Sequence, residues 1–212
     1  MTRQEYKDIE FYMLECMKDS AHDKYHIYRV LNAAVEIARS ETGVNQDVII
    51  AASLLHDIGR DAQATGKCTC HAVFGAGMAY HFLIELGWSE ADASHVSDCI
   101  TTHRFRGDRQ PATIEAKIIF DADKLDATGL IGIARTLIYA GQTHVPMYVL
   151  DDAGQIIPDK SADSFISEYN FKLKNVYDTF YTPRGAELAN SRKVDAQNFV
   201  DTLTKEISGY AH

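Results

Sequence analysis

The sequence predicts an all-α fold in a single domain over residues 1–212. In nearly every segment, apolar residues recur at spacings of three and four, which is the pattern of helices that bury one face. The composition shows no shift that would mark a domain boundary. With 212 residues, of which 46% are hydrophobic and 24% charged, the chain has the make-up of a globular protein and the length to bury a full core.

Two helices are predicted between residues 26 and 55. Apolar residues at positions 27, 30, 31, 34 and 37 indicate a long helix that ends at 40–43. Asn45 begins a second helix, which runs through Leu55. The almost continuous apolar character of this second helix predicts burial on most sides, so its end carries His56 and Asp57 into the interior.

The other helices follow from the same periodicity and from residues that begin or end helices. Small and polar residues predict a loop at 59–70, and a basic loop is expected at 104–111. Gly87 ends one helix, and Ser89 with Asp92 resembles a capping box that opens the next. The predicted helices span 73–86, 89–102, 115–123, 130–139, 164–181 and 186–207.

One segment departs from the helical pattern. At 147–157, two short apolar runs flank the residues from Asp151 to Gly154, as the strands of a hairpin flank their turn. We expect a small β-hairpin excursion there, inserted between helices.

Composition and charge exclude several classes of protein. The formal net charge of −9 argues against a surface for a nucleic-acid polymer, which needs concentrated Lys and Arg. The longest apolar runs are far shorter than the roughly 20 residues of a membrane span, and residues 1–10 are too polar for a secretory leader. Four cysteines are too few for a secreted disulfide scaffold. The expected location is therefore the cytoplasm.

Four residues form a candidate metal site: His26, His56, Asp57 and Asp123. Each lies on or at the end of a predicted helix, and helices packed side by side could bring the four together. The His-Asp pair directly follows the buried run 51–55, and two strongly polar groups in that place need a partner that offsets their desolvation. A divalent cation is such a partner, and this ligand set suits Mn, Fe, Co, Ni or Zn with coordination positions left open.

The motifs around these residues resemble those of the HD-domain phosphohydrolases, and of one bacterial branch in particular. The order His, then His-Asp, then a distant Asp is that of the family. The matching stretches are AHDKYHIYRV (21–30), AASLLHDIGR (51–60), ITTHRFRG (100–107) and EAKIIFDADKLDATGLIGIAR (115–135). Similarity extends into YTPRGAELANSRK and the final helix, so it covers most of the chain.

The resemblance implies a helical bundle that hydrolyses nucleotides or other phosphate esters. It places the metal ligands on His26, His56, Asp57 and Asp123, because the family pattern Ala-Asp-Lys/Arg-Leu selects Asp123 rather than Asp121. One divalent ion is expected, with manganese first and Fe, Co, Ni, Zn or Mg as alternatives. Such an ion would lower the pKa of a coordinated water and polarise a phosphoryl oxygen.

His71 and His103 allow two interpretations. Some HD subfamilies use two further histidines at comparable places to hold a second metal. In this branch we expect one metal, with these histidines contacting phosphate or orienting other groups. Asp57 and His103 are the candidates for the catalytic proton acceptor.

Several charged residues are candidates for contacts with the substrate. Arg29 follows His26 by three positions on one helical face, and Arg104 follows His103 directly. Asp126 lies one helical turn after Asp123 and could meet a substrate hydroxyl. The candidates are Arg29, Lys67, Arg104, Lys124 and Asp126. Cys68, Cys70 and His71 offer too few ligands for a structural zinc site.

Two rival functions remain open at this stage. A dinuclear iron oxygenase shares the six-residue order of ligands, and a non-catalytic module could sense a nucleotide through the same pocket. The partner expected in either hydrolase or sensor is a small phosphorylated molecule, and a homodimer is compatible with the sequence. The sequence leaves the identity of the phosphate ester open.

Overall fold

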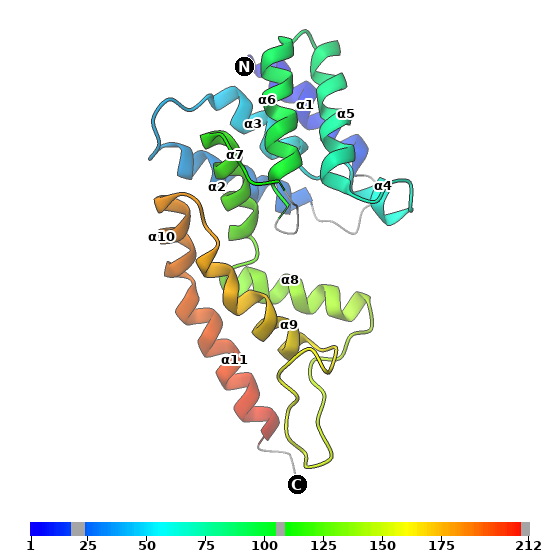
Figure 1. Ribbon diagram of the computed structural model, residues 1–212, viewed down its shortest axis with the longest axis vertical. Coiled ribbons are helices and arrows are strands. Elements are labelled where there is room, and N and C mark those ends of the chain that lie inside the picture. Colours follow the sequence, from blue (N-terminus) through cyan, green and yellow to red (C-terminus); the bar gives the residue numbers. More distant parts are fainter. Residues whose placement is uncertain (18–23, 105–108, 209–212) are drawn as a thin grey trace. The chain divides into compact units, whose positions relative to one another are not determined.

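The computed structural model describes residues 1–17, 24–104 and 109–208 and confirms the all-α fold (Figure 1). Within these residues the chain forms α-helices, one 3₁₀ helix and turns, without a β-sheet. The chain folds into two compact units, Met1–Asp123 and Lys124–His212. We call them the first and second unit. Whether they form a single domain, as the sequence suggests, stays a prediction.

The first unit is a bundle in which one helix is enclosed by others. Helix α3 (Gln46–Leu55) packs against α1, α2, α5 and α6, and its residues from Val48 to Leu55 are buried except for Ile50. The predicted burial on most sides is therefore confirmed. The helices of this unit are α1 (Arg3–Cys16), α2 (Lys24–Ala38), α3, α4 (Arg60–Ala64), α5 (His71–Glu85), α6 (Glu90–Thr102) and α7 (Ile114–Leu125), whose last residues pass into the second unit.

The N-terminus of α3 is fixed by side chains from its own cap and from α7. Asn45 accepts hydrogen bonds from the backbone N–H groups of Asp47 and Val48, as an N-cap residue should. The backbone N–H of Asn45 donates to the buried carboxylate of Glu115 at 2.8 Å. Glu115 also lies 3.2 Å from Nε2 of His95 on α6. These contacts hold α3, α6 and α7 together at the end opposite His56.

Helices α5 and α6 lie side by side and are joined by the predicted short connection (Figure 1). Gly87 follows the end of α5 with φ of +93°, a conformation that favours glycine. Ser89 accepts from the backbone N–H of Asp92 at 3.1 Å and opens α6 as predicted. α5 itself begins at His71, two residues earlier than the periodicity indicates.

The start of α5 lies very close to the turn that follows α3. A Cβ atom built on Gly59 would be 2.3 Å from the carbonyl oxygen of His71 and 2.8 Å from the backbone nitrogen of Gly75. Only glycine fits such an approach of two backbones. The contact therefore fixes the position of His71 relative to the end of α3.

The second unit has its own small core. Helices α9 and α11 both pack against α8, and apolar residues from the three helices form the buried cluster together with Leu173. The cluster comprises Ile133, Phe165, Ile166, Tyr169, Leu173, Ala196 and Val200. The elements are α8 (Gly129–Gln142), α9 (Phe165–Phe171), the 3₁₀ helix η1 (Leu173–Asp178), α10 (Pro183–Ser191) and α11 (Lys193–Ser208).

The excursion at 147–157 is a hairpin turn with a single antiparallel bridge, between Leu150 and Ile156. Asp151 donates its backbone N–H to the carbonyl of Gln155 at 2.8 Å, and Gly154 has φ of +75°. The predicted turn is thus present, but its flanking runs pair too briefly to form strands.

Some helix boundaries differ from the prediction. The loop at 59–70 contains α4, whose five residues are too few for a periodic pattern. The predicted helix at 164–181 is split at Lys172 into α9 and η1, and the one at 186–207 is split at Arg192 into α10 and α11. In both cases the apolar spacing continues through the break, so periodicity alone does not reveal it. Helix α1 has no predicted counterpart.

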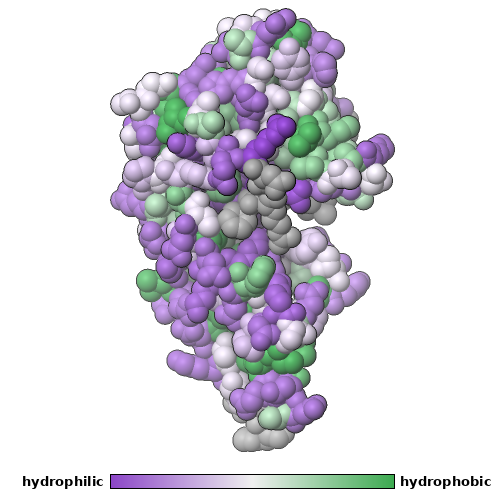
Figure 2. Space-filling view, viewed as in Figure 1, coloured by the Kyte–Doolittle hydropathy of each residue, from purple (hydrophilic) through white to green (hydrophobic). Residues whose placement is uncertain are grey.

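On the face drawn in Figure 2, hydrophilic side chains cover most of the surface and hydrophobic ones form separate groups. Among the described residues, no helix combines the length and the apolar character that crossing a membrane requires.

Candidate metal centre

Six side chains of the first unit bring their ligand atoms together in its interior. His26 lies in α2, and His56 and Asp57 follow α3. His71 begins α5, His103 follows α6, and Asp123 lies near the end of α7. The four histidines and Asp57 are at most 2% exposed, and Asp123 is partly buried. The centroids of the His26 and His56 imidazole rings lie 5.2 Å apart, and those of the His56 and His103 rings lie 5.1 Å apart.

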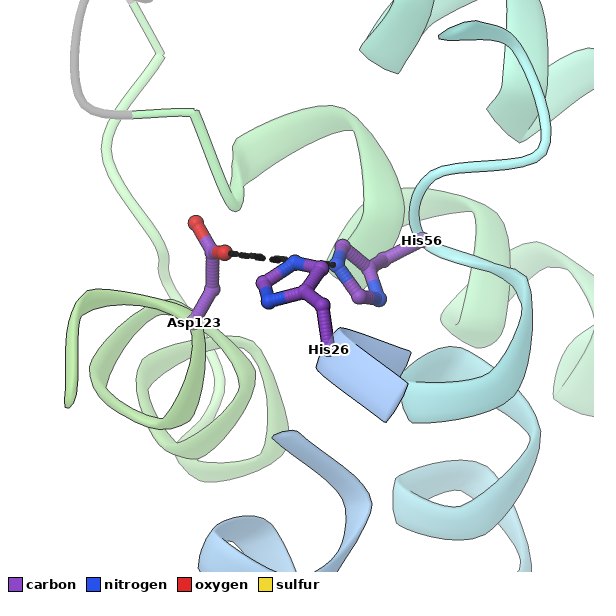
Figure 3. A group of neighbouring side chains, drawn as sticks. All are labelled: His26, His56 and Asp123. Atoms are coloured by element: carbon purple, nitrogen blue, oxygen red, sulfur yellow. Dashed lines mark hydrogen bonds and ion pairs between the residues drawn. The ribbon is translucent and has the colours of Figure 1, made fainter. Parts of the chain in front are cut away.

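The first ligand group consists of His26, His56, Asp123 and Oδ2 of Asp57. Figure 3 shows that the His26, His56 and Asp123 side chains point toward one another from three elements. Nε2 of His26 is 3.2 Å from Nε2 of His56 and 3.4 Å from Oδ1 of Asp123. Oδ2 of Asp57 is 3.6 Å from each of the two Nε2 atoms. All four atoms therefore face one small volume.

The second ligand group consists of the other carboxylate oxygen of Asp57, with His71 and His103. Oδ1 of Asp57 lies 3.5 Å from Nε2 of His71 and 3.6 Å from Nε2 of His103. The three ligand atoms lie within 4.8 Å of one another. Asp57 is thus shared by two groups of potential ligands, one at each of its oxygens.

Backbone carbonyls determine which nitrogen carries the proton in two of these histidines. Nδ1 of His56 is 2.8 Å from the carbonyl oxygen of Ser53, and Nδ1 of His103 is 2.6 Å from that of Ile100. A carbonyl oxygen only accepts hydrogen bonds, so Nδ1 donates in both rings. In the neutral ring, Nε2 then carries a lone pair and faces the site as a ligand atom would.

The tautomer of His71 follows from a side-chain amide. The amide nitrogen of Gln63 donates to the carbonyl oxygen of Thr69 at 2.9 Å, which leaves Oε1 of Gln63 facing Nδ1 of His71 at 2.6 Å. That oxygen accepts from Nδ1–H, so Nε2 of His71 also presents a lone pair to Asp57. Gln63 therefore orients His71 as the partners of metal-bound histidines do.

Burial keeps His56 and His71 neutral, while Asp57 stays charged. Burial lowers the pKa of His56 to about 4. Burial, followed by the guanidinium of Arg60, lowers the pKa of His71 to about 3. Burial alone would raise the pKa of Asp57, but the imidazoles of His56, His103 and His26 and the guanidinium of Arg60 together hold it well below its usual range. At neutral pH the site thus holds acceptor atoms that face one another.

This arrangement fits a divalent cation. Both carboxylate oxygens of Asp57 and Nε2 of His71 are buried and make no directed hydrogen bond to the described residues. Buried acceptors of this kind are costly unless a cation or a donor compensates them. Ligands about 2.1 Å from one ion lie about 3 to 3.5 Å from each other, and most distances in the first ligand group are close to this range.

Comparison with protein families matches residues 24–128 to the family described as the HD domain, a span that includes all six candidate ligand residues. Residues 24–128 belong to the HD-domain family. The predicted resemblance is thereby confirmed. Within this HD domain, the His-Asp pair that gives the family its name is His56 with Asp57.

Relatives of this HD-domain protein match it over nearly its whole length. YpgQ of Bacillus subtilis is 29% identical over 196 residues, which are 91% of this chain and 87% of YpgQ. A crystal structure of YpgQ gives a TM-score of 0.77 and covers 97% of each chain at 29% identity. A crystal structure of YpgQ in complex with ADP gives 0.75, with 96% and 95% covered at 27% identity.

A third similar structure is that of a hydrolase. The crystal structure of an HD-superfamily hydrolase from Bacillus thuringiensis has a TM-score of 0.74 and 29% identity, and 96% of this chain and 97% of that chain are covered. The HD-domain match and the similarity to an HD-superfamily hydrolase support a metal-dependent hydrolase, and the His/Asp groups of this chain are consistent with that chemistry.

The structure places the predicted substrate contacts in different surroundings. Arg29 lies half-buried on α2, one turn after His26, and Lys67 is exposed in the loop after α4. Arg104 donates from Nη1 to Sγ of Cys70 at 3.5 Å, next to the start of α5. Residues 105–108 of the predicted basic loop lie outside the described residues.

Two further predicted residues belong to the second unit. Lys124 lies in the last turn of α7. Asp126 is 4% exposed, and its Oδ2 is 2.6 Å from Nη1 of Arg135. Substrate contact by these residues stays a prediction.

Two residues of the site are absent from the sequence-based set. Arg60 lies with Nε 2.9 Å from Oδ1 of Asp57, and Gln63 orients His71 as described above. Arg60 follows Asp57 by three positions, the same spacing that singles out Arg29 after His26, so this signal was available. Gln63 carries no such signal, because its partner is brought near by the turn between α4 and α5.

Proposed function

We propose that this protein is a phosphohydrolase that uses one divalent metal ion, held by His26, His56, Asp57 and Asp123, to cleave a phosphate ester or anhydride of a nucleotide. The observation that carries the proposal is the first ligand group, in which two imidazole nitrogens and two carboxylate oxygens face one volume. Four protein ligands leave room for water and substrate around an ion with five or six positions.

When bound, the ion supplies a Lewis acid that makes water a better nucleophile near neutral pH. The chain's residues supply the rest. The carbonyls of Ser53 and Ile100 and the amide of Gln63 fix the imidazole rings, which reduces the motion of the site. His71 and His103 present Nε2 atoms that can accept a proton or a metal, and each would need a further proton to donate to a phosphate oxygen.

A nucleotide is the proposed substrate because YpgQ, which is similar over nearly the whole chain, forms a complex with ADP. Phosphate groups carry negative charge, and basic side chains would stabilise the charge that develops on their oxygens. Arg29, Lys67, Arg104 and Lys124 are the proposed contacts. Manganese is the proposed ion.

The test is metal analysis of the purified protein, followed by a hydrolysis screen. The protein is stripped with a chelator and reloaded with Mn, Co, Ni, Fe, Zn or Mg, and release of phosphate and pyrophosphate is measured over nucleoside mono-, di- and triphosphates. We expect metal-dependent turnover of at least one nucleotide class. A protein that binds no metal, or that releases neither product with any metal, would contradict the proposal.

The second ligand group supports one alternative function, a dinuclear iron oxygenase, because it supplies the two further histidines that such a site needs. This alternative requires two irons in each chain and consumption of oxygen. The same metal analysis separates the two, since a hydrolase with one ion contains one metal per chain and consumes no oxygen.

A further inference from the structure

Arg60 lies beside Asp57, the residue that the two ligand groups share, and it contacts only one of the two carboxylate oxygens. Its Nε is 2.9 Å from Oδ1 of Asp57, and its side chain is 30% exposed while that of Asp57 is fully buried. Oδ1 is also the oxygen that the second ligand group shares with His71 and His103. The other oxygen, Oδ2, faces the imidazoles of His26 and His56 at 3.6 Å each. The guanidinium therefore pairs with the oxygen of the second ligand group.

Arg60 and Asp57 form an ion pair whose geometry is not that of a hydrogen bond. Nε of Arg60 and Oδ1 of Asp57 are both buried atoms, and neither makes a directed hydrogen bond to the described residues despite the short distance. The interaction is therefore one of charge, and charge acts on whatever else approaches Oδ1. A divalent ion at Oδ1 would therefore lie within a few ångströms of the positively charged guanidinium of Arg60.

We propose that Arg60 sets the number of metal ions in the site. Its positive charge beside Oδ1 of Asp57 disfavours a second divalent cation in the second ligand group, so the protein retains one ion although six ligand residues are present. The inference rests on the proposed function, which assigns the first ion. It makes Arg60 a positioning residue for metal content, acting through Asp57.

The test is a titration of the metal-free protein with Mn²⁺ alone, in which binding is measured by calorimetry and by electron paramagnetic resonance. We expect one tight Mn²⁺ per wild-type chain. In Arg60→Gln a second Mn²⁺ should bind about tenfold or more tightly than it does in the wild type, because the like charge is gone. Two ions that share Asp57 should also produce a spin-coupled signal that a single ion lacks. Arg60→Lys keeps the charge and should retain one ion.

Two controls show whether the effect belongs to this position. Arg39 forms an exposed ion pair of 3.3 Å with Glu36, at the same spacing of three residues, near the C-terminal end of α2. Arg39→Gln should therefore leave one Mn²⁺ ion per chain. Adding His71→Ala to Arg60→Gln should remove the second ion and return the count to one. Circular dichroism verifies that each variant keeps its helices, and Arg60→Met provides a second uncharged variant.

The outcomes separate this inference from the proposed function. Two Mn²⁺ ions of equal affinity in the wild-type chain would overturn the inference but leave a metal-dependent hydrolase. One ion in both folded, uncharged variants at Mn²⁺ concentrations that saturate the first site would also overturn it. A wild-type chain that binds no Mn²⁺ would contradict the proposed function itself.

Discussion

Asp57 in the first unit and Asp126 in the second are both buried aspartates beside an arginine, yet their surroundings differ. Asp126 has Nη1 of Arg135 at 2.6 Å from its Oδ2, and the same Nη1 donates to its carbonyl oxygen at 3.3 Å. Asp57 has one ion pair at Oδ1, and imidazole nitrogens approach both of its oxygens.

The difference shows how a structural carboxylate is distinguished from a candidate metal ligand. A guanidinium that donates to both the side chain and the backbone compensates a buried carboxylate by itself. In the neutral rings of His56, His71 and His103, Nε2 carries a lone pair and cannot donate, so these atoms add acceptors to a place that already has too many. Both aspartates are buried beside an arginine, and the type of the other neighbouring atoms separates them.

The largest expected effect is at the centre of the first ligand group. His56→Ala or Asp57→Ala should abolish metal binding and activity together, because each removes a ligand and leaves buried polar atoms facing one another. Elemental analysis and the hydrolysis assay measure both. Full metal occupancy in either variant would contradict the assignment of the replaced residue as a metal ligand, and in Asp57→Ala it would leave Asp57 without the role that distinguishes it from Asp126.

The choice between two aspartates of α7 sharpens the same contrast. Asp123→Asn should weaken Mn²⁺ binding on the order of 100-fold, more than loss of an outer partner does, because Oδ1 of Asp123 lies 3.4 Å from Nε2 of His26. Asp121→Asn is the matched control, since Asp121 is buried on the same helix but outside both ligand groups. Equal losses of affinity would show that the wrong aspartate was chosen.

A smaller effect is expected in the second ligand group. His71→Ala and His103→Ala should each lower the rate about 10- to 100-fold while one metal per chain remains. Rates and metal content are measured on the same preparations. If the native protein holds two metals and either variant loses one, both histidines are ligands and the dinuclear alternative gains support.

The smallest effect on activity is expected at Asp126. Asp126→Asn should reduce the free energy of unfolding by about 1 to 2 kcal/mol, since it weakens a buried ion pair with a partly exposed arginine. Metal content should not change, and thermal unfolding with metal analysis provides the measurement. A raised KM at unchanged stability would instead support the predicted contact between Asp126 and the substrate.

The sequence predicted the parts of this fold that depend on neighbouring residues. The start of α3 at Asn45, the end of α5 at Gly87 and the burial of α3 all follow from local pattern, and the structure confirms them. The breaks at Lys172 and Arg192 were not predicted, because apolar spacing continues across them while the backbone turns.

The site was predictable where residue type alone indicates chemistry. His26, His56, Asp57 and Asp123 could be named from a motif, and the structure brings their ligand atoms together. The roles of Gln63 and Arg60 depend on which atom faces which, and that is decided by the turn after α3 and the start of α5. The spacing of three residues after Asp57 could have singled out Arg60, but it does not tell which oxygen of Asp57 the guanidinium faces, and it gives no signal for Gln63.

Gly59 contributes no ligand and no charge, yet its missing side chain constrains how the sequence can vary. A methyl group there would collide with the backbone of His71 and Gly75, so an alanine would displace the start of α5 and, with it, one histidine of the second ligand group. A related chain that keeps all six ligand residues but lacks this glycine would therefore retain the motif without the geometry. Judging whether a homologue is active requires reading Gly59 together with the histidines and aspartates.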